Sequence, residues 1–529
     1  MVKDILLVNH MKINFFLFFY LFFIFIFFLI FFIRLFQLTI VKGNYYWTLS
    51  ENNRLREIII EPERGEIFDR KGFSLVKNTP ADIPHLEKYL QKKNLEMIKS
   101  PRVYQLPEII APFIGYQQLA DQQDLINDNC QHKLKPGEKV GKKGVEKLLD
   151  CDLRGIEGKM LVEIDAQGKF LRLVNLIPSQ PGNNIKLSLD LELQKKAYDL
   201  VKDKKAAVVA LKPKTGEILV LVSTPSFNPA ETIANYFSDK NKPLFNRATE
   251  GVYPPGSLFK LIIATAALEE GAINEKTQIE DTGILHAGSL TFGNWYYLQY
   301  GKTEGMVDIV KAIRRSNDIF FYKAGEKTGV NKIKKWAEIF GLGKATGIGL
   351  DEEEGLIPSA FWKEETIKDR WYLGDTYNLS IGQGYVGVTP LQMAMVTSVF
   401  ANNGYLCQPK LLKDEKPNCK KLPISQKTLN LVREGMKEAC SPGGTGWPLF
   451  EFKIKNEKGK IEQIQTACKT GTAETPDKTG QPHAWITVFA PYENPEIVLT
   501  ILIEEGGQGS DVAGPIAKEL LKTYFERSQ

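Results

Sequence analysis

The 529-residue chain is poor in histidine and cysteine and has almost no excess of charge. None of its five histidines pairs with another at i, i+4, which argues against a metal site built on a histidine pair of a helix. Its six cysteines form no Cys-x-x-Cys, which argues against structural zinc, and they are too few for a disulfide scaffold. A net charge of +5 over 529 residues is too small to indicate a nucleic-acid-binding protein. At ~150 residues per domain, the length instead predicts several folded domains.

Long apolar runs are also scarce, and one stretch is long enough to cross a membrane. Residues 15–33 are nineteen uncharged residues, eleven of them Phe, and a helix of this length spans ~28 Å. A buried helix of a soluble core would show a polar face, and a cleaved signal peptide would end in a small-x-small site. The sequence that follows is Arg34-Leu35-Phe36-Gln37, so we expect an uncleaved single transmembrane helix at 13–36 after a tail at 1–12. Basic residues on both sides leave the orientation open.

The remaining chain divides at a Pro-Gly-Asn-Asn turn at 181–184. Residues 37–183 are expected to form an elongated pedestal, in which 159–174 contain strands broken at Gln167-Gly168. Residues 80–140 are charged, Gln-rich and without clear periodicity, which predicts a small, loosely packed subdomain.

Residues 184–529 show a tighter pattern and are expected to form a second domain. Asp190 is placed to cap a helix that follows a strand at 185–189, and a turn at 212–216 joins two apolar runs. The expected strands are 185–189, 206–211, 217–222, 464–473, 484–490 and 497–503, and a last helix covers 513–525. Strands on either side of a long helical insert predict an α+β fold, an antiparallel sheet covered by helices.

The most informative segment is residues 253–264, which contain Ser257-Leu258-Phe259-Lys260. Pro-Pro-Gly precedes Ser257, so a helix begins close to it and places Ser257 and Lys260 on one face. A serine needs a base to become a nucleophile, and a desolvated lysine with a lowered pKa can be that base. The alternative is that Ser257 and Lys260 match the Ser-x-x-Lys pattern by chance on a core helix. Such chance matches occur, because Ser74-Leu75-Val76-Lys77 has the same pattern outside any helical periodicity.

Two further motifs each occur more than once in the chain, so the copy that belongs to a site has to be distinguished from chance matches, here called decoys. Lys-Thr-Gly begins at Lys214, Lys327, Lys469 and Lys478. Only Lys469 lies on an expected strand, where Gly471 lets a substrate backbone approach closely. Ser-x-(Asn/Asp) occurs at Ser50 and as Ser316-Asn317-Asp318, and the second lies between the other two motifs.

The ordered set Ser-x-x-Lys, Ser-x-Asp and Lys-Thr-Gly-Thr resembles that of penicillin-binding proteins and serine β-lactamases. The chain is most similar to the class B penicillin-binding proteins of the elongation type, penicillin-binding protein 2. The motifs that carry this resemblance are Arg64–Arg70, Gly144–Glu146, Gly374–Gly384, Val388–Ala394 and His483–Trp485. It implies a serine β-lactamase-like transpeptidase domain on a pedestal, and a D,D-transpeptidase that cross-links peptidoglycan stem peptides and binds β-lactams.

The resemblance also implies a role for each site residue. Ser257 would form the acyl-enzyme, Lys260 would be its base, Ser316 would relay a proton and Asp318 would hold the hydrogen-bond network. Lys469, Thr470, Gly471 and Thr472 would bind the terminal carboxylate of the substrate. The backbone N–H groups of Ser257 and Thr472 would form the oxyanion hole.

No cofactor is expected. Some relatives hold a metal near the second motif, and Asp281 is a candidate ligand here. Asn294, Tyr300 and Asn317 occupy the other expected places, so we predict no metal. Cys407, Cys419 and Cys440 are expected to include one disulfide, with the pairing left open, while Cys468 is expected to be a buried strand residue and His483 a structural one.

The resemblance implies a cell-membrane, single-pass protein whose catalytic domain is extracytoplasmic and whose residues 1–12 are cytoplasmic. Expected partners are a polytopic membrane glycosyltransferase of the SEDS type and other elongation-complex proteins. Two rival functions stay open: a β-lactamase or D,D-carboxypeptidase, for which Glu364, Glu365 and Asp369 are candidate bases, and a catalytically silent scaffold.

Overall fold

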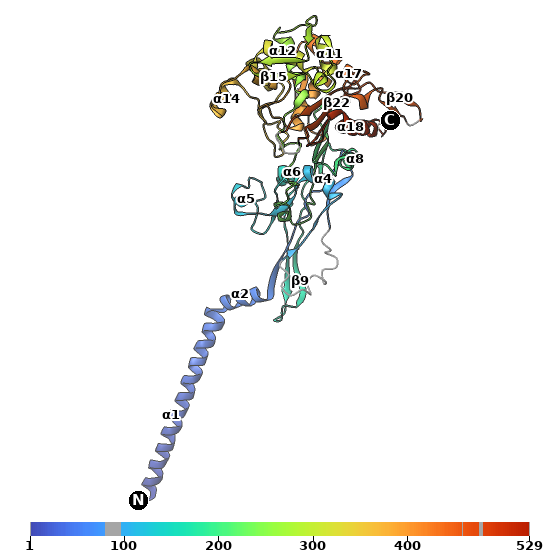
Figure 1. The fold of residues 1–529 in the computed structure, drawn as a ribbon. Helices are drawn as coiled ribbons and strands as arrows, with labels where there is room; N and C mark the ends of the chain where they lie inside the picture. Colours follow the sequence, from blue (N-terminus) through green and yellow to red (C-terminus); the bar gives the residue numbers. More distant parts are fainter. Residues whose placement is uncertain (1, 80–96, 457–458, 476–479, 528–529) are drawn as a thin grey trace. The chain divides into compact units, whose positions relative to one another are not determined.

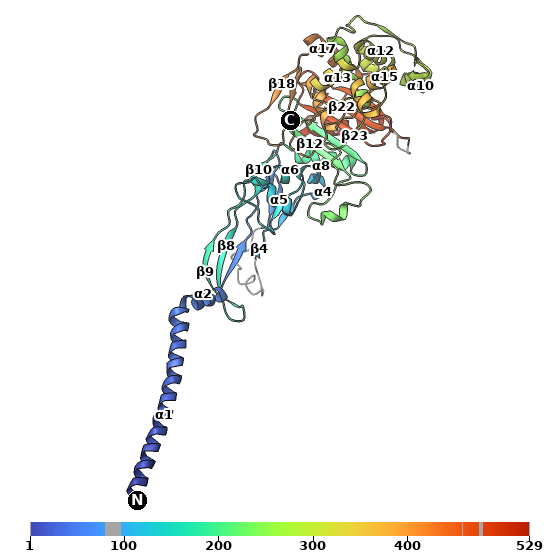
Figure 2. The same cartoon turned by 90° about the vertical axis from the view of Figure 1, so that its left-hand side faces the viewer.

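The computed structural model describes residues 2–79, 97–456, 459–475 and 480–527, with side chains from residue 14 onward. The chain divides into two compact units (Figures 1 and 2). Unit 1 comprises Met1–Glu63, Thr79–Pro101 and Gly155–Pro181, and unit 2 comprises Arg64–Asn78, Arg102–Arg154 and Gly182–Gln529. Parts of the expected pedestal, 64–78 and 102–154, therefore pack with the catalytic domain. The boundary at 183/184 remains a prediction.

Unit 1 begins with the long apolar helix α1 (Val2–Phe36), followed by a short π-helix (Gln37–Val41) and α2 (Gly43–Arg54). Within the part of the chain that the structure describes, Asn14–Val41 is the one helical stretch long and apolar enough to cross a membrane, with a mean hydropathy of 3.1. Its described side chains face outward and are not covered by protein. This helix supports the predicted single-pass anchor.

The rest of unit 1 is a four-stranded sheet in the order β4-β1-β8-β9. Its strands are β1 (Leu55–Ile60), β4 (Met97–Ile98), β8 (Gly158–Ile164) and β9 (Phe170–Ile177). Alternate residues of β1 and β8 point inward and form a small core of Ile58, Ile60, Ile98, Met160 and Val162. The predicted strand break is confirmed, because Gly168 turns between β8 and β9 with φ of +82°.

The N-terminal segments of unit 2 form the sheet β10-β2-β3-β5 and several short helices. They are β2 (Ile67–Phe68), β3 (Ser74–Asn78), β5 (Arg102–Tyr104), α4 (Pro107–Ile114), β6 (Gln117–Leu119), α5 (Gln122–Asn127), β7 (Lys139–Gly141), α6 (Gly144–Leu148), α7 (Asp150–Leu153) and β10 (Ile185–Lys186). The expectation of loose packing at 80–140 is wrong for α4. Ile110, Phe113 and Ile114 are completely buried in the main core, and residues 80–96 lie outside the described residues. The buried residues 109–114 are a short continuous apolar run, which periodicity alone cannot assign to a helix or a strand.

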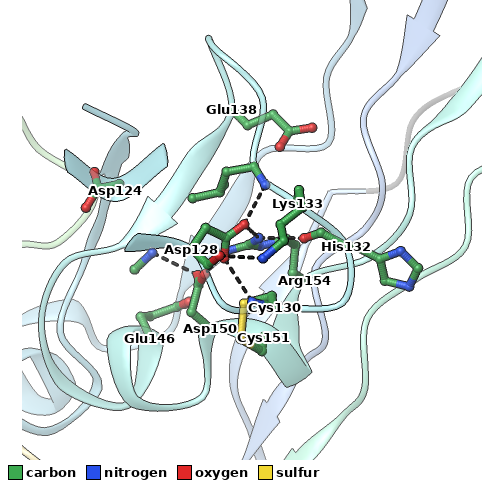
Figure 3. Close-up of polar contacts among 12 residues, drawn as sticks. Asp124, Asp128, Cys130, His132, Lys133, Glu138, Glu146, Asp150, Cys151 and Arg154 are labelled. Atoms are coloured by element: carbon green, nitrogen blue, oxygen red, sulfur yellow. Dashed lines mark hydrogen bonds and ion pairs between the residues drawn. A yellow bond between two sulfur atoms is a disulfide. The ribbon is translucent and has the colours of Figure 1, made fainter. Parts of the chain in front are cut away.

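A buried charge network holds these segments together. Glu146 accepts hydrogen bonds from Arg64 Nε and Arg102 Nε, both at 2.8 Å, and Arg64 also donates to Asp150. Figure 3 shows the adjoining part, where Arg154 pairs with Asp128 and Asp150 next to the Cys130–Cys151 disulfide. Burial alone would raise the pKa of Glu146, but the two guanidinium groups lower it below its ordinary value.

The central element of unit 2 is an antiparallel sheet in the order β12-β11-β23-β22-β21. Its strands are β11 (Ala206–Leu211), β12 (Ile218–Thr224), β21 (Ala467–Ala473), β22 (His483–Ala490) and β23 (Ile497–Ile503). Side chains of β11 alternate between two cores. Val208 packs in the core that includes α8 (Leu191–Val201) and α18 (Gly509–Arg527). Val209 packs in the core with α9 (Lys260–Glu269) and α16 (Pro390–Ala401). The predicted α+β sheet covered by helices is confirmed, as is the cap, since Asp190 accepts from Leu193 N at 3.1 Å.

The insert between β12 and β21 is mainly helical and carries several small hairpins. Its helices are α9 (Lys260–Glu269), α10 (Trp295–Tyr300), α11 (Ile309–Arg315), α12 (Asp318–Thr328), α13 (Val330–Ile339), α14 (Ala360–Ile367), α15 (Leu373–Ser380), α16 (Pro390–Ala401) and α17 (Gln426–Ala439). The short strands are β13 (Ile279–Asp281), β14 (Ile284–Ala287), β15 (Leu290–Gly293), β16 (Gly305–Val307), β17 (Tyr405–Cys407), β18 (Cys419–Lys421), β19 (Lys453–Lys455) and β20 (Ile461–Gln463), with 3-10 turns at Ile233–Tyr236, Gly256–Leu258 and Trp447–Leu449.

All six cysteines are paired, and the expectation of one disulfide among Cys407, Cys419 and Cys440 is confirmed by Cys407–Cys419. The pairs are Cys130–Cys151, Cys407–Cys419 and Cys440–Cys468. Cys468 is buried on a strand as predicted, but it is also cross-linked. The partners are 12 to 28 residues apart in the sequence, so only the fold shows which of them meet.

Candidate active site

The first motif lies at the junction of a 3-10 turn and a buried helix. Gly256–Leu258 form the turn and α9 begins at Lys260, close to the predicted helix start. Ser257 is partly exposed, whereas the Lys260 side chain is completely buried. The indole N–H of Trp485 donates to Pro254 O at 3.1 Å and holds the segment before the turn.

Two glycines allow the chain to pass close to this turn. Gly256 N donates to Gly382 O at 2.9 Å, and both residues have positive φ, +54° and +72°. A Cβ on Gly382 would lie 2.1 Å from Gly256 O, and one on Gly256 would lie 2.8 Å from Thr472 O. The Gly-Gln-Gly sequence at 382–384 therefore serves the backbone geometry around Ser257.

The second motif lies between two helices. Ser316 ends α11 in the left-handed conformation, with φ of +53°, and α12 begins at Asp318. Asn317 caps α12 by accepting from Phe320 N at 2.9 Å. This sharp reversal brings Ser316 and Asp318 to the buried amine of Lys260.

Lys260 connects the first motif to the second. Its Nζ donates to Asp318 Oδ1 at 2.6 Å, to Ser316 O at 2.8 Å and to Ser316 Oγ at 3.2 Å. Burial lowers the pKa of Lys260 below its ordinary value, while Asp318 opposes this shift. A lysine with a lowered pKa is closer to the neutral form that a general base requires.

The third motif completes the site from β21. Lys469 Nζ donates to Ser316 Oγ at 2.8 Å, so this hydroxyl lies between two lysine amines. Burial and then the positive charge of Lys260 hold the pKa of Lys469 well below its ordinary value. Gly471 makes room for the first motif, because a Cβ there would lie 2.6 Å from Leu258 Cδ1.

The hydroxyls that follow Lys469 are held by residues outside the three motifs. Thr470 Oγ1 donates to Thr445 Oγ1 at 2.8 Å, and Thr472 Oγ1 donates to Gln508 Oε1 at 3.0 Å. The sequence did not single out Thr445 or Gln508, because each belongs to a turn with no periodicity or motif of its own.

A buried amide network supports the second motif. Asp318 Oδ2 accepts from Trp295 N at 2.9 Å, and Asn294 Oδ1 accepts from Asp318 N at 3.1 Å. Asp281 Oδ2 accepts from the side-chain amides of Asn294 and Asn317, at 2.8 and 2.9 Å.

The structure also locates the residues considered for a metal. Asp281, Asn294 and Asn317 lie together, with the two amides donating to the carboxylate, whereas Tyr300 is exposed. Over the described ranges, no group of three or more His, Cys, Asp or Glu is placed to hold a metal ion.

The decoy motifs lie elsewhere in the fold. Ser74 and Lys77 lie on β3, Lys214 lies in the turn after β11, and Lys327 lies in the last turn of α12. Ser50 lies in α2, and Lys478 lies outside the described residues.

His483 begins β22 and accepts from Glu505 N through Nδ1 at 3.1 Å, which favours the structural role predicted for it.

The fold and the site define a class of protein. A partly exposed serine, two buried lysines and a second serine between them, on an antiparallel sheet covered by helices, are the arrangement of the penicillin-recognising acyltransferases and β-lactamases.

Comparison with known proteins identifies the family. Residues 206–522 match the penicillin-binding protein transpeptidase domain, and residues 96–187 match the penicillin-binding protein dimerisation domain. The chain belongs to the penicillin-binding protein transpeptidase family.

Individual relatives agree with this assignment. The chain is 31% identical to the peptidoglycan D,D-transpeptidase MrdA of Haemophilus influenzae, over 93% of this chain and 89% of that protein. It is similar to penicillin-binding protein 2 of Helicobacter pylori in a complex with MreC, with a TM-score of 0.74 and 28% identity over 90% of this chain and 99% of that one. It also resembles a chain from a structure described as "Structural coordination of polymerization and crosslinking by a peptidoglycan synthase complex", with a TM-score of 0.75 and 29% identity over 95% of this chain and 97% of that one.

Proposed function

We propose that this chain is a peptidoglycan D,D-transpeptidase of cell-wall elongation and that Ser257 is its nucleophile. The observation that carries the proposal is the convergence of the three motifs, in which Lys260 and Lys469 both donate to Ser316 Oγ. Two of the relatives named above are described as a peptidoglycan D,D-transpeptidase and as part of a peptidoglycan synthase complex, and their similarity extends over nearly the whole chain.

Acylation would begin with proton transfer from Ser257 to neutral Lys260. Ser257 Oγ attacks the carbonyl carbon of the penultimate D-alanine, and the backbone N–H groups of Ser257 and Thr472 stabilise the oxyanion. The C–N bond to the last D-alanine breaks, and its amine takes a proton through Ser316, which lies between Lys260 and Lys469. The amine of a neighbouring stem peptide then attacks the ester and releases Ser257.

The β21 wall of the site would bind the donor peptide. Lys469 supplies positive charge and Thr470 and Thr472 supply hydroxyls for the terminal carboxylate, while Gly471 allows close approach of the peptide backbone. β-Lactams carry a carboxylate in the corresponding place and would acylate the same serine.

The disulfides support an extracytoplasmic catalytic domain. Disulfides persist in oxidising compartments and are rare in the cytosol, and all three lie in unit 2. With the apolar helix α1 as a single-pass anchor, we infer that unit 2 lies outside the cell membrane and that residues 1–12 are cytoplasmic.

A glycan-polymerising partner would complete the activity. The two matched domains, at 96–187 and 206–522, are a dimerisation domain and a transpeptidase domain. We expect a polytopic membrane glycosyltransferase of the SEDS type and further elongation-complex proteins as partners, in line with the complexes named for the two similar structures.

Labelling of the full-length chain with a fluorescent penicillin tests the proposal. Wild type is expected to form a stable covalent adduct, and Ser257→Ala none. Ser74→Ala is a matched control, because it belongs to the decoy Ser-x-x-Lys and its buried hydroxyl has no hydrogen-bond partner among the described residues. Labelling of Ser257→Ala would refute the assignment.

The same experiment separates the rival functions. An adduct that disappears within seconds would indicate a hydrolase, and no adduct on folded wild type would indicate a scaffold. Of the candidate hydrolytic bases, Glu364 and Glu365 are exposed on α14. Asp369 pairs with Lys363 at 3.1 Å, and this pairing lowers the pKa of Asp369 and makes it a weaker base.

A further inference from the structure

A glycine-rich loop at residues 440–446, here called the bridge loop, is attached to β21 on both sides of Lys469. Cys440 is disulfide-bonded to Cys468, the residue before Lys469. Thr445 accepts a hydrogen bond from Thr470, the residue after Lys469, at 2.8 Å. The two neighbours of Lys469 are thus both held by one short loop.

The other contacts of the bridge loop lead to the second motif. Arg314 Nη2 donates to Pro442 O at 2.8 Å, and Arg315 Nη1 donates to Gly443 O at 2.9 Å. These two arginines are the last residues of α11 and directly precede Ser316. The bridge loop therefore connects the chain before Ser316 to the strand that carries Lys469.

The path of the bridge loop leaves little freedom. A Cβ on Gly446 would lie 2.4 Å from Cys468 Sγ, and one on Gly444 would lie 2.2 Å from Ala439 O. Gly443 has φ of +88°, and a Cβ there would lie 2.4 Å from Arg314 Nη2. Close packing of this kind transmits the position of one wall of the site to the other.

We propose that the bridge loop positions Lys469 and Thr470 against Ser316, with Thr445 and the Cys440–Cys468 disulfide as its positioning residues. The inference rests on the proposed transpeptidase function. Lys469 Nζ reaches Ser316 Oγ at 2.8 Å, and a shift of β21 of less than 1 Å would break this hydrogen bond.

Thr445 has a second consequence for substrate binding. In this hydrogen bond Thr470 donates its hydroxyl proton to Thr445 Oγ1. The hydroxyl proton of Thr445 itself is therefore left for another acceptor. Thr445 is partly exposed, and its hydroxyl can donate to the carboxylate beside Lys469 while Thr470 donates to Thr445. The chemical group that Thr445 would recognise is thus the terminal carboxylate of the donor peptide or of a β-lactam.

The first test compares Thr445→Val with Thr445→Ser in the full-length chain. The dissociation constant for a carboxylate-bearing β-lactam and the acylation rate constant are measured separately. Thr445→Val is expected to weaken binding about five- to tenfold, the equivalent of one hydrogen bond, with a smaller effect on the rate constant. Thr445→Ser keeps the hydroxyl and is expected to restore binding to within about twofold of wild type.

The second test removes the disulfide. Cys440→Ser with Cys468→Ser is expected to lower the acylation rate constant about tenfold, because Lys469 loses one of its two fixed neighbours. Cys407→Ser with Cys419→Ser is the matched control. It removes a disulfide between β17 and β18, and its acylation is expected to stay within about twofold of wild type.

The outcomes distinguish this inference from the proposed function. If Thr445→Val binds and acylates like wild type while Ser257→Ala is inert, the bridge-loop inference is wrong and the transpeptidase assignment stands. If Thr445→Ser is as weak as Thr445→Val, the hydroxyl does not matter and the inference is overturned. If Ser257→Ala still forms the adduct, the proposed function itself fails.

Discussion

Replacing Asp318 with asparagine is expected to move the acidic limb of the pH profile of acylation toward lower pH. Asp318 Oδ1 is 2.6 Å from Lys260 Nζ, and Asp318 raises the pKa of Lys260 against the effect of burial. It also raises the pKa of Lys469, which is otherwise lowered by burial and by Lys260. Without this carboxylate, both amines lose their protons at lower pH.

The size of the shift follows from the geometry. An opposite charge within hydrogen-bonding distance typically moves a pKa by about 1–3 units, and the buried position of Lys260 reduces screening by water. We therefore expect the acidic limb to move by about 1–3 pH units in Asp318→Asn. The height of the plateau is expected to fall as well, because the amide cannot accept from both Lys260 and Trp295 N as the carboxylate does.

The assay is the second-order rate constant for acylation by a fluorescent penicillin, measured across pH on the full-length chain. Asp308→Asn is the matched control. Asp308 caps α11 by accepting from Lys311 N at 2.8 Å, and asparagine is an equally good cap, so the limb should stay in place. A limb that is unmoved or shifted to higher pH in Asp318→Asn would refute the assignment of a lysine as the base.

Three further predictions test the base, the turn and the buried charge network. Lys260→Arg keeps the charge but cannot release a proton, so penicillin labelling should slow by at least about a thousandfold in a folded chain. Gly382→Ala would place a Cβ 2.1 Å from Gly256 O at a φ of +72°. The acylation rate constant should therefore fall by about tenfold or more, while the chain stays anchored in the membrane by α1. Glu146→Gln should destabilise unit 2 by about 3–5 kcal/mol in denaturant titration, whereas Glu57→Gln at an exposed ion pair should change little. Since the pKa of Glu146 is lowered in the folded chain, its contribution is present above the unfolded pKa and lost as pH falls, so Glu146→Gln should flatten the acid dependence of stability.

Many of the helices, strands and motifs of this protein could be predicted from its sequence, because they depend on residues that are close together in the chain. The apolar run of α1 has no polar face, the strands of the main sheet are short apolar runs bounded by turns, and Asp190 precedes a helix that it does cap. The order of the three motifs, with Lys469 on an expected strand and its decoys in expected turns, was sufficient to select Lys260, Ser316 and Lys469, which the fold brings together.

Other features depend on contacts between residues far apart in the chain, and only the tertiary structure decided them. The pairing of Cys440 with Cys468 follows from where α17 ends beside β21, which no spacing rule encodes. Thr445 lies in a turn without a motif, and it becomes part of the site because Thr470 lies beside it. The grouping of 102–154 with the catalytic domain likewise rests on buried contacts such as the hydrogen bond from Gln194 Nε2 to Ile109 O. Residue type and period determine which elements form, whereas the packing of distant surfaces determines which side chains meet.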